Sequence, residues 1–201
     1  MAPGPAERHD GRMNEQHLTY LASPEWAARL RADLLPWIER VAVLGDDVLE
    51  IGPGPGLTTD ILRERAAQVT AVEIDGALAA ALRERLADTN VEVVQGDAAA
   101  LELPDTRYTA ATCFSVLHHV PTPEYQDRVL AEILRVLRPG AGLFATDARD
   151  LDPIRQGHDG DTFVPLPVQE LPQRLERIGF TDVDLEIGDY EIRFAAYRPT
   201  I

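Results

Sequence analysis

The stretch that decides the fold is Val48-Leu-Glu-Ile-Gly-Pro-Gly-Pro-Gly56, a short apolar run that leads into three glycines. Residues 48–51 predict a strand, and residues 57–65, which follow the glycines, predict a helix. Glycine lets the backbone turn sharply and lets a ligand approach closely, because it has no Cβ. A strand, a glycine loop and a helix in this order are typical of nucleotide-binding folds.

Strands and helices alternate downstream of this loop. The apolar patterns predict strands over residues 69–74, 91–95, 109–116 and 142–146, and helices over residues 76–87 and 123–137. Such alternation implies parallel strands with helices on both faces. The tail adds a helix over residues 171–178 and two strands, residues 183–187 and 190–197, around the hairpin signal Gly188-Asp189. We therefore expect an α/β fold: a doubly wound, mostly parallel seven-stranded sheet with an antiparallel last strand.

The length of 201 residues predicts a single domain over residues 1–201. Ser23 followed by Pro24 marks the start of a helix that keeps its apolar spacing to about residue 44, with a kink or break at Pro36. The remaining parts are an N-terminal arm or lid (residues 1–22), a core (47–147), a long polar loop (149–167), and a C-terminal helix and hairpin (168–201).

The composition excludes several function classes. Acidic residues outnumber basic ones by 34 to 19, the net charge is −15, and every basic residue is arginine. Without lysine there is no Schiff base and no Walker-type phosphate site. An anionic surface repels phosphate backbones, so we expect no nucleic-acid partner. The sequence shows neither a membrane-spanning run nor a signal peptide, and its single cysteine, Cys113, cannot form an internal disulfide, so we expect a cytoplasmic protein and no membrane partner.

The details of the glycine loop argue against a dinucleotide. Leu57 stands where the dinucleotide fingerprint has its third glycine, and Pro53 and Pro55 have no N–H to offer a pyrophosphate. Glu50 adds a carboxylate beside the loop, which favours a cationic or neutral ligand group. Two further acids, Glu73 and Asp97, follow the next two strands, and the three side chains should therefore share one crevice.

The chain resembles the class I S-adenosylmethionine-dependent methyltransferases over residues 47–147. The resemblance rests on VLEIGPGPG, VTAVEID, VVQGDA, CFSVLHHV and EILRVLRPGAGLFATD, in the family's order and spacing. It implies a Rossmann-like methyltransferase fold, S-adenosylmethionine as cofactor, and a cofactor-binding role for residues 47–147. The VLHHV segment is most similar to the branch that methylates small molecules. The RNA adenine dimethyltransferases carry an Asn-Pro-aromatic motif where this chain has Phe-Ser-Val-Leu-His-His, so that alternative is weaker.

The resemblance assigns cofactor contacts residue by residue. The methionine part would meet Gly52, Gly54, Gly56, Phe114 and Ser115, with Glu50 near its ammonium; Glu73 would hold the ribose hydroxyls; Ile74, Asp97 and Ala98 would bind the adenine.

His118 and His119 are the candidate catalytic residues, because O- or N-methylation by in-line displacement often needs a base. Placed on the end of a strand, consecutive residues point in opposite directions, so at most one should face the substrate. Weaker substrate-binding candidates are His17 and Tyr20 in the arm and His158 in the long loop. The HDGD segment has no metal-ligand spacing, and we expect no metal.

The sequence thus predicts a methyltransferase for a small-molecule acceptor, as a monomer or a homodimer. Three alternatives stay open: a cofactor-binding protein without turnover, a related enzyme that uses the sulfonium for another reaction such as a cyclisation, and an NAD-type oxidoreductase. The acceptor itself is not identified by any motif.

Overall fold

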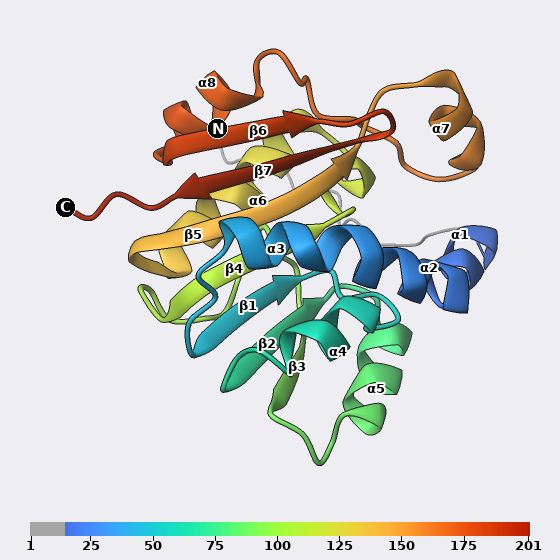
Figure 1. The fold of residues 1–201 in the computed structure, drawn as a ribbon, viewed down its shortest axis with the longest axis horizontal. Helices are drawn as coiled ribbons and strands as arrows, with labels where there is room; N and C mark the ends of the chain where they lie inside the picture. Colours follow the sequence, from blue (N-terminus) through green and yellow to red (C-terminus); the bar gives the residue numbers. More distant parts are fainter. Residues whose placement is uncertain (1–14) are drawn as a thin grey trace, which may run out of the picture.

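The computed structural model describes residues 15–201, with side chains from Leu18 onward. Seven strands form one sheet in the order β3-β2-β1-β4-β5-β7-β6 (Figure 1). The strands are β1 Asp47–Ile51, β2 Gln68–Glu73, β3 Val91–Gln95, β4 Tyr108–Phe114, β5 Leu137–Ala148, β6 Thr181–Ile187 and β7 Glu191–Tyr197. Neighbouring strands from β3 to β5 pair in parallel, whereas β7 is antiparallel to both β5 and β6. The predicted seven-stranded fold is confirmed.

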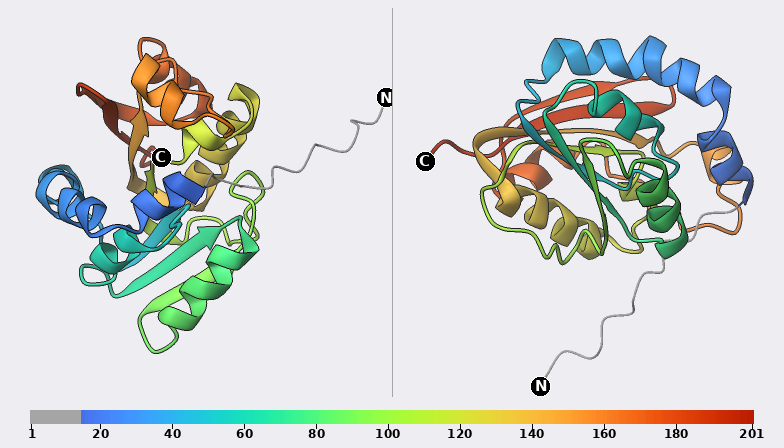
Figure 2. Two further views of the ribbon diagram at one scale, coloured as in Figure 1. Left: turned by 90° about the vertical axis from the view of Figure 1, so that its right-hand side faces the viewer. Right: turned by 90° about the horizontal axis from the view of Figure 1, so that it is seen from below.

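Helices cover both faces of the sheet (Figure 2). One face carries α1 Glu15–Leu21, α2 Pro24–Arg29, the π-helical turn η1 Leu30–Leu34, α3 Leu35–Val41, α4 Leu57–Leu62 and α5 Gly76–Arg85. The other face carries α6 Pro123–Val136 and α8 Leu171–Ile178. Alternate residues of one strand enter the two cores, because Val48 packs with Trp37 and Leu62 whereas Leu49 packs with Ile133. This two-sided packing explains the near-continuous apolar strands of the sequence.

The N-terminal helical segment starts where the sequence predicts. Ser23 caps α2, and its side chain accepts a hydrogen bond from Trp26 N–H at 3.1 Å. The segment does not break at Pro36, because η1 widens the helix directly before α3, and Leu35 N–H bonds to Leu30 O. A π-helical turn of this kind changes the hydrogen-bond pattern next to a residue that has no N–H.

Several other boundaries differ from the predictions. The helix of residues 123–137 ends one residue early, and β5 runs through Pro139-Gly140, where a bulge in its pairing with β4 accommodates the proline. The loop of residues 149–167 contains a short helix, α7 Asp152–Gly157. The predicted strand over residues 109–116 ends at Phe114 and is followed by the 3₁₀ turn η2 Leu117–His119. Among the described residues, no helix has the length and apolar character needed to cross a membrane.

Candidate active site

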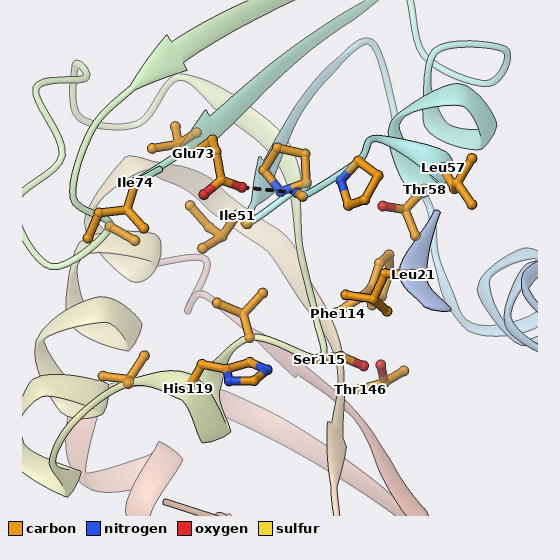
Figure 3. Close-up of a pocket in the computed structure, with 18 of the residues that line it drawn as sticks. Leu21, Ile51, Leu57, Thr58, Glu73, Ile74, Phe114, Ser115, His119 and Thr146 are labelled. Atoms are coloured by element: carbon orange, nitrogen blue, oxygen red, sulfur yellow. Dashed lines mark hydrogen bonds between the residues drawn. The ribbon is translucent and has the colours of Figure 1, made fainter. Parts of the chain in front are cut away.

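The carboxyl ends of β1, β2, β3 and β4 meet at one edge of the sheet, and a pocket opens there (Figure 3). The cofactor residues predicted from the sequence and found in its wall are Gly52, Gly54, Glu73, Ile74, Asp97, Ala98, Phe114 and Ser115. Ligands of doubly wound sheets bind outside such strand ends. The structure therefore brings these residues together in one pocket, and their contacts with a cofactor stay a prediction.

Two glycines of the loop have different steric reasons to be glycine. Gly52 has a φ of 65°, and a Cβ there would lie 2.5 Å from Val116 Cγ2. Gly54 has a φ of 54°, but a Cβ there would meet nothing within 4 Å. Glycine at position 52 is thus needed for packing within the protein. Glycine at position 54 leaves free the space in the pocket that a side chain would fill. Gly56, which starts α4 in the left-handed region, is not among the described residues lining the pocket.

Glu73 holds the glycine loop in place. Its Oε2 accepts a hydrogen bond from Gly54 N–H at 3.0 Å (Figure 3). Its Oε1 accepts one from Asp75 N–H at 3.0 Å. Only 5% of Glu73 is exposed, and this burial raises its pKa. Each carboxylate oxygen keeps one lone pair, so the side chain can still accept bonds from a vicinal diol.

Glu50 lies beneath the loop rather than in the pocket wall. Its carboxyl accepts hydrogen bonds from the hydroxyls of Thr58 and Thr59, the latter at 2.6 Å, and both threonines belong to the first turn of α4. Burial raises the pKa of Glu50 to about 7. Thr58, and not Glu50, lines the pocket, so the contact of Glu50 with the cofactor's ammonium stays a prediction.

Asp97 is paired with Tyr125, a residue that sequence reasoning did not identify. Tyr125 donates its hydroxyl to Asp97 Oδ2, and Ala99 N–H donates to Oδ1 at 2.8 Å. Burial, with Asp97 beside it, raises the pKa of Tyr125 to about 12, so the phenol remains a donor. An amine that binds Asp97 must therefore share one of the two oxygens with a donor that is already bound there.

The turn after β4 brings the histidines to the pocket. Ser115 has a φ of 58°, which is rare for a residue other than glycine, and its N–H donates to Thr146 O at 2.8 Å. The chain thus bends away from the sheet before His118 and His119. The premise that both histidines lie on a strand was wrong, because a three-residue turn leaves no alternating pattern in the sequence.

His119 faces the pocket, alongside Ser115 and Thr146 (Figure 3). His118 lies behind it, 2% exposed, and its Nδ1 is 2.5 Å from Asp147 Oδ1. His118 is not among the described residues that line the pocket. One of the two histidines thus faces the pocket, and the turn rather than strand alternation separates them.

His158, expected in a flexible loop, packs on both of these histidines. Its ring centroid lies 5.0 Å from that of His118 and 5.2 Å from that of His119. Burial lowers the pKa of His158. The structure thereby brings three imidazoles together from two distant segments, which no spacing in the sequence indicates.

The two candidates in the N-terminal arm have different outcomes. Tyr20 is 45% exposed and packs against Trp26, which lines the pocket, at 5.4 Å between ring centroids. The arm does reach the pocket through Leu21, the last residue of α1. His17 belongs to α1, but its side chain lies outside the part that the structure describes.

A further part of the pocket wall was not predicted from the sequence. It consists of Trp26, Arg29, Leu30, Asp33 and Leu34 from the N-terminal helical segment, together with Glu191 and Arg193 from β7. Arg193 is held by Glu191 at 2.5 Å and donates to Asp33 O at 3.1 Å. The apolar period of these elements indicates packing alone, so the sequence gives no signal that their polar residues border the pocket.

Fold and pocket together define a Rossmann-like protein of the kind that binds S-adenosylmethionine. The family model described as "Methyltransferase domain" matches residues 49–145. Over these residues, which are just under half of the chain, the sequence is similar to the S-adenosylmethionine-dependent methyltransferases. A solved S-adenosylmethionine-dependent methyltransferase from Aquifex aeolicus has the same fold, with a TM-score of 0.71 and 21% identity over 92% of this chain and 99% of that one.

Curated relatives differ in the acceptors that their names state. A ubiquinone biosynthesis O-methyltransferase from Pseudomonas entomophila is 31% identical over 113 residues, which is 54% of this chain and 47% of that protein. A probable ribosomal RNA small subunit methyltransferase A from Methanopyrus kandleri is 47% identical over 70 residues, 34% of this chain and 25% of that protein. The chain thus spans half or less of the length of these relatives. The expected absence of a nucleic-acid partner is not settled by them.

Proposed function

We propose that this protein transfers the methyl group of S-adenosylmethionine to an oxygen or nitrogen of a small molecule. One observation carries the proposal: a single pocket joins the glycine loop and the acids of the strand ends to a second, mixed apolar and charged wall that ends at His119. The first part suits the cofactor, and the second suits an acceptor of limited size.

The cofactor half has the electrostatic character that a sulfonium and an ammonium require. Gly54 N–H is used by Glu73, and the prolines on either side of Gly54 have no N–H, so the loop offers few donors to a phosphate. Glu73, Asp97 and the buried Glu50 make the region acidic. This pattern disfavours NAD, whose pyrophosphate needs donors, and favours a cationic cofactor.

The acceptor half is enclosed by elements from both ends of the described chain. Leu21, Trp26 and Leu30 form an apolar side, while Arg29 and Arg193 supply charge. Arg193 is paired with Glu191, and the net charge of the chain is −15. A pocket of this kind suits a small molecule with an apolar body better than an RNA backbone, which needs an extended basic surface.

His119 is the side chain placed to act on the acceptor's proton. It lines the same pocket as Ser115 and Thr146 beyond the end of β4. Methyl transfer is an in-line displacement, so alignment and removal of water supply much of the rate, and handling of the proton adds to it.

A methyl-transfer assay tests the proposal. The purified chain is incubated with methyl-labelled S-adenosylmethionine and either a panel of phenols, quinols and amines or purified ribosomal RNA. Glu73→Ala is the test variant, because it removes the proposed ribose acceptor and the anchor of Gly54. Glu84→Gln, an exposed carboxylate of α5, is the matched control.

We expect label in a small molecule, together with formation of the demethylated cofactor. Glu73→Ala should lower the affinity for the cofactor about 10–100-fold. Glu84→Gln should bind the cofactor and transfer the methyl group as wild type does. Label in RNA alone would contradict the small-molecule acceptor. Tight cofactor binding with no methyl transfer in any arm would contradict the proposed turnover and favour a binding protein or another sulfonium reaction.

A further inference from the structure

Three imidazoles converge beside the pocket in a manner that packing alone does not require. Among the described residues, His118, His119 and His158 each offer one nitrogen, and these nitrogens lie within 4.8 Å of one another. The ring centroids of His118 and His119 are 4.1 Å apart. Phe163 closes the group on one side, 4.5 Å from His158 and 5.6 Å from His118 between centroids.

Two of the imidazoles are oriented by hydrogen bonds at their other nitrogen. His118 Nδ1 is 2.5 Å from Asp147 Oδ1, and His158 Nδ1 is 2.7 Å from Ile154 O. A carboxylate or a carbonyl at Nδ1 holds the proton there and leaves Nε2 with a lone pair, as second-shell groups do for metal-binding histidines. His118 Nε2 is fully buried and has no hydrogen-bond partner among the described residues.

A buried polar network holds the two segments of the cluster together. Gln126 of α6, which is fully buried, donates to Leu117 O at 2.9 Å and to Val164 O at 2.7 Å. Val164 N–H donates in turn to His118 O at 2.7 Å. The loop that carries His158 is thereby attached to the turn that carries the other two histidines. These buried hydrogen bonds hold the three imidazoles close together in the fold.

We propose that His118, His119 and His158 bind one divalent transition-metal ion, with zinc as the reference ion, and that Asp147 positions His118 for it. Imidazole nitrogens suit zinc, copper, iron and nickel. Nitrogens on a tetrahedral zinc ion lie about 3.4 Å apart, so side-chain shifts of about 1 Å close the site. Three protein ligands leave one position of the ion open.

The open position has a consequence for catalysis that rests on the proposed function. Because His119 lines the pocket, an acceptor oxygen can approach the ion from the pocket side. Coordination lowers the pKa of a hydroxyl and favours the alkoxide or phenolate that attacks the methyl group. In the metal-bound protein His119 then acts as a ligand, and the ion takes over the activation of the acceptor.

Metal titration of the full chain tests the site directly. Untagged protein, treated with chelator and then freed of it, is titrated with Zn²⁺ by calorimetry, and Co²⁺ absorption in the visible range reports tetrahedral nitrogen ligation. The test variants are His158→Gln, His118→Gln and Asp147→Asn. Asp159→Asn is the control, because it removes an exposed carboxylate next to His158 and leaves all three imidazoles.

We expect one site of micromolar or tighter affinity, weakened at least 100-fold in both histidine variants, 10–100-fold in Asp147→Asn and not at all in Asp159→Asn. Titration of each variant with S-adenosylmethionine in the same buffer shows that the fold persists. Wild-type protein that binds S-adenosylmethionine but not Zn²⁺, or His158→Gln protein that binds Zn²⁺ as wild type does, would overturn the metal site and leave the proposed function intact. Zn²⁺ binding without S-adenosylmethionine binding would contradict the proposed function and leave the metal site intact.

Discussion

At the scale of single residues, the Glu50 carboxyl links stability to pH. Burial raises its pKa from 4.5 to about 7 in the folded protein. A raised pKa means that the folded state favours the protonated form, so the contribution to stability is complete below pH 4.5 and is lost as the pH rises to 7. The shift amounts to about 3 kcal/mol of unfolding free energy.

We expect Glu50→Gln to remove this dependence in the cofactor-free protein. An amide of the same shape can still bond both threonine hydroxyls but carries no charge. The free energy of unfolding of the variant, relative to that of wild type, should therefore rise by about 3 kcal/mol between pH 4.5 and pH 8. Urea unfolding at the two pH values measures it, with Glu84→Gln as control. The same pH dependence in wild type and Glu50→Gln would show that Glu50 is not the group.

The two neighbouring histidines should respond differently to removal. His119→Ala takes away a pocket side chain, so we expect turnover to fall about 10²–10⁴-fold at little cost in stability. His118→Ala leaves the buried Asp147 carboxyl without its partner, which should lower the free energy of unfolding by about 2–4 kcal/mol. Steady-state rates and urea unfolding of both variants measure this. Equal rates in wild type and His119→Ala would remove the catalytic role.

At the scale of elements, two glycines of the loop should affect different properties, one the binding of the cofactor and the other the stability of the fold. Alanine at position 54 adds a Cβ in open space at the pocket wall, whereas alanine at position 56 places it 2.3 Å from Leu82 Cδ1 and 2.5 Å from Arg85 Nη2. Both positions carry the cost of a left-handed alanine, about 1–2 kcal/mol. Position 56 adds the cost of overpacking, about 1–3 kcal/mol.

Gly54→Ala should therefore lower the affinity for S-adenosylmethionine at least tenfold with a modest loss of stability. Gly56→Ala should mainly lower stability. Calorimetric titration and thermal unfolding of the two variants check the contrast. A reversed order, with Gly56→Ala the weaker binder and Gly54→Ala the less stable protein, would contradict the geometry of the loop.

The regular elements were predictable because their patterns are repetitive. Val48 and Leu49 face opposite cores, and Asp75 and Thr122 cap their helices as their side chains suggest. The irregular pieces were not predictable, since η1, η2 and α7 are each one or two turns long and leave no measurable period. Two of these short pieces, η2 and α7, place the histidines, and η1 places part of the pocket wall.

At the scale of the whole molecule, the sequence located one half of the site better than the other. The cofactor half follows the carboxyl ends of β3, β2, β1 and β4, which are neighbours in the sheet, so each motif indicates its own place at one edge. The other half is assembled from the N-terminal helical segment, the turn after β4, the loop with α7 and strand β7. Residues such as Trp26, His119 and Arg193 reach the same pocket only through the tertiary fold, which local patterns do not encode.

The central claim is that the pocket at the strand ends binds S-adenosylmethionine. Calorimetric titration of the purified chain with S-adenosylmethionine, its demethylated product and NAD, in parallel, tests it most directly. We expect micromolar binding of the first two, at one site per chain, and no heat from NAD. Binding of NAD alone would contradict it, because a loop with so few N–H donors could not then be the cause of the selectivity.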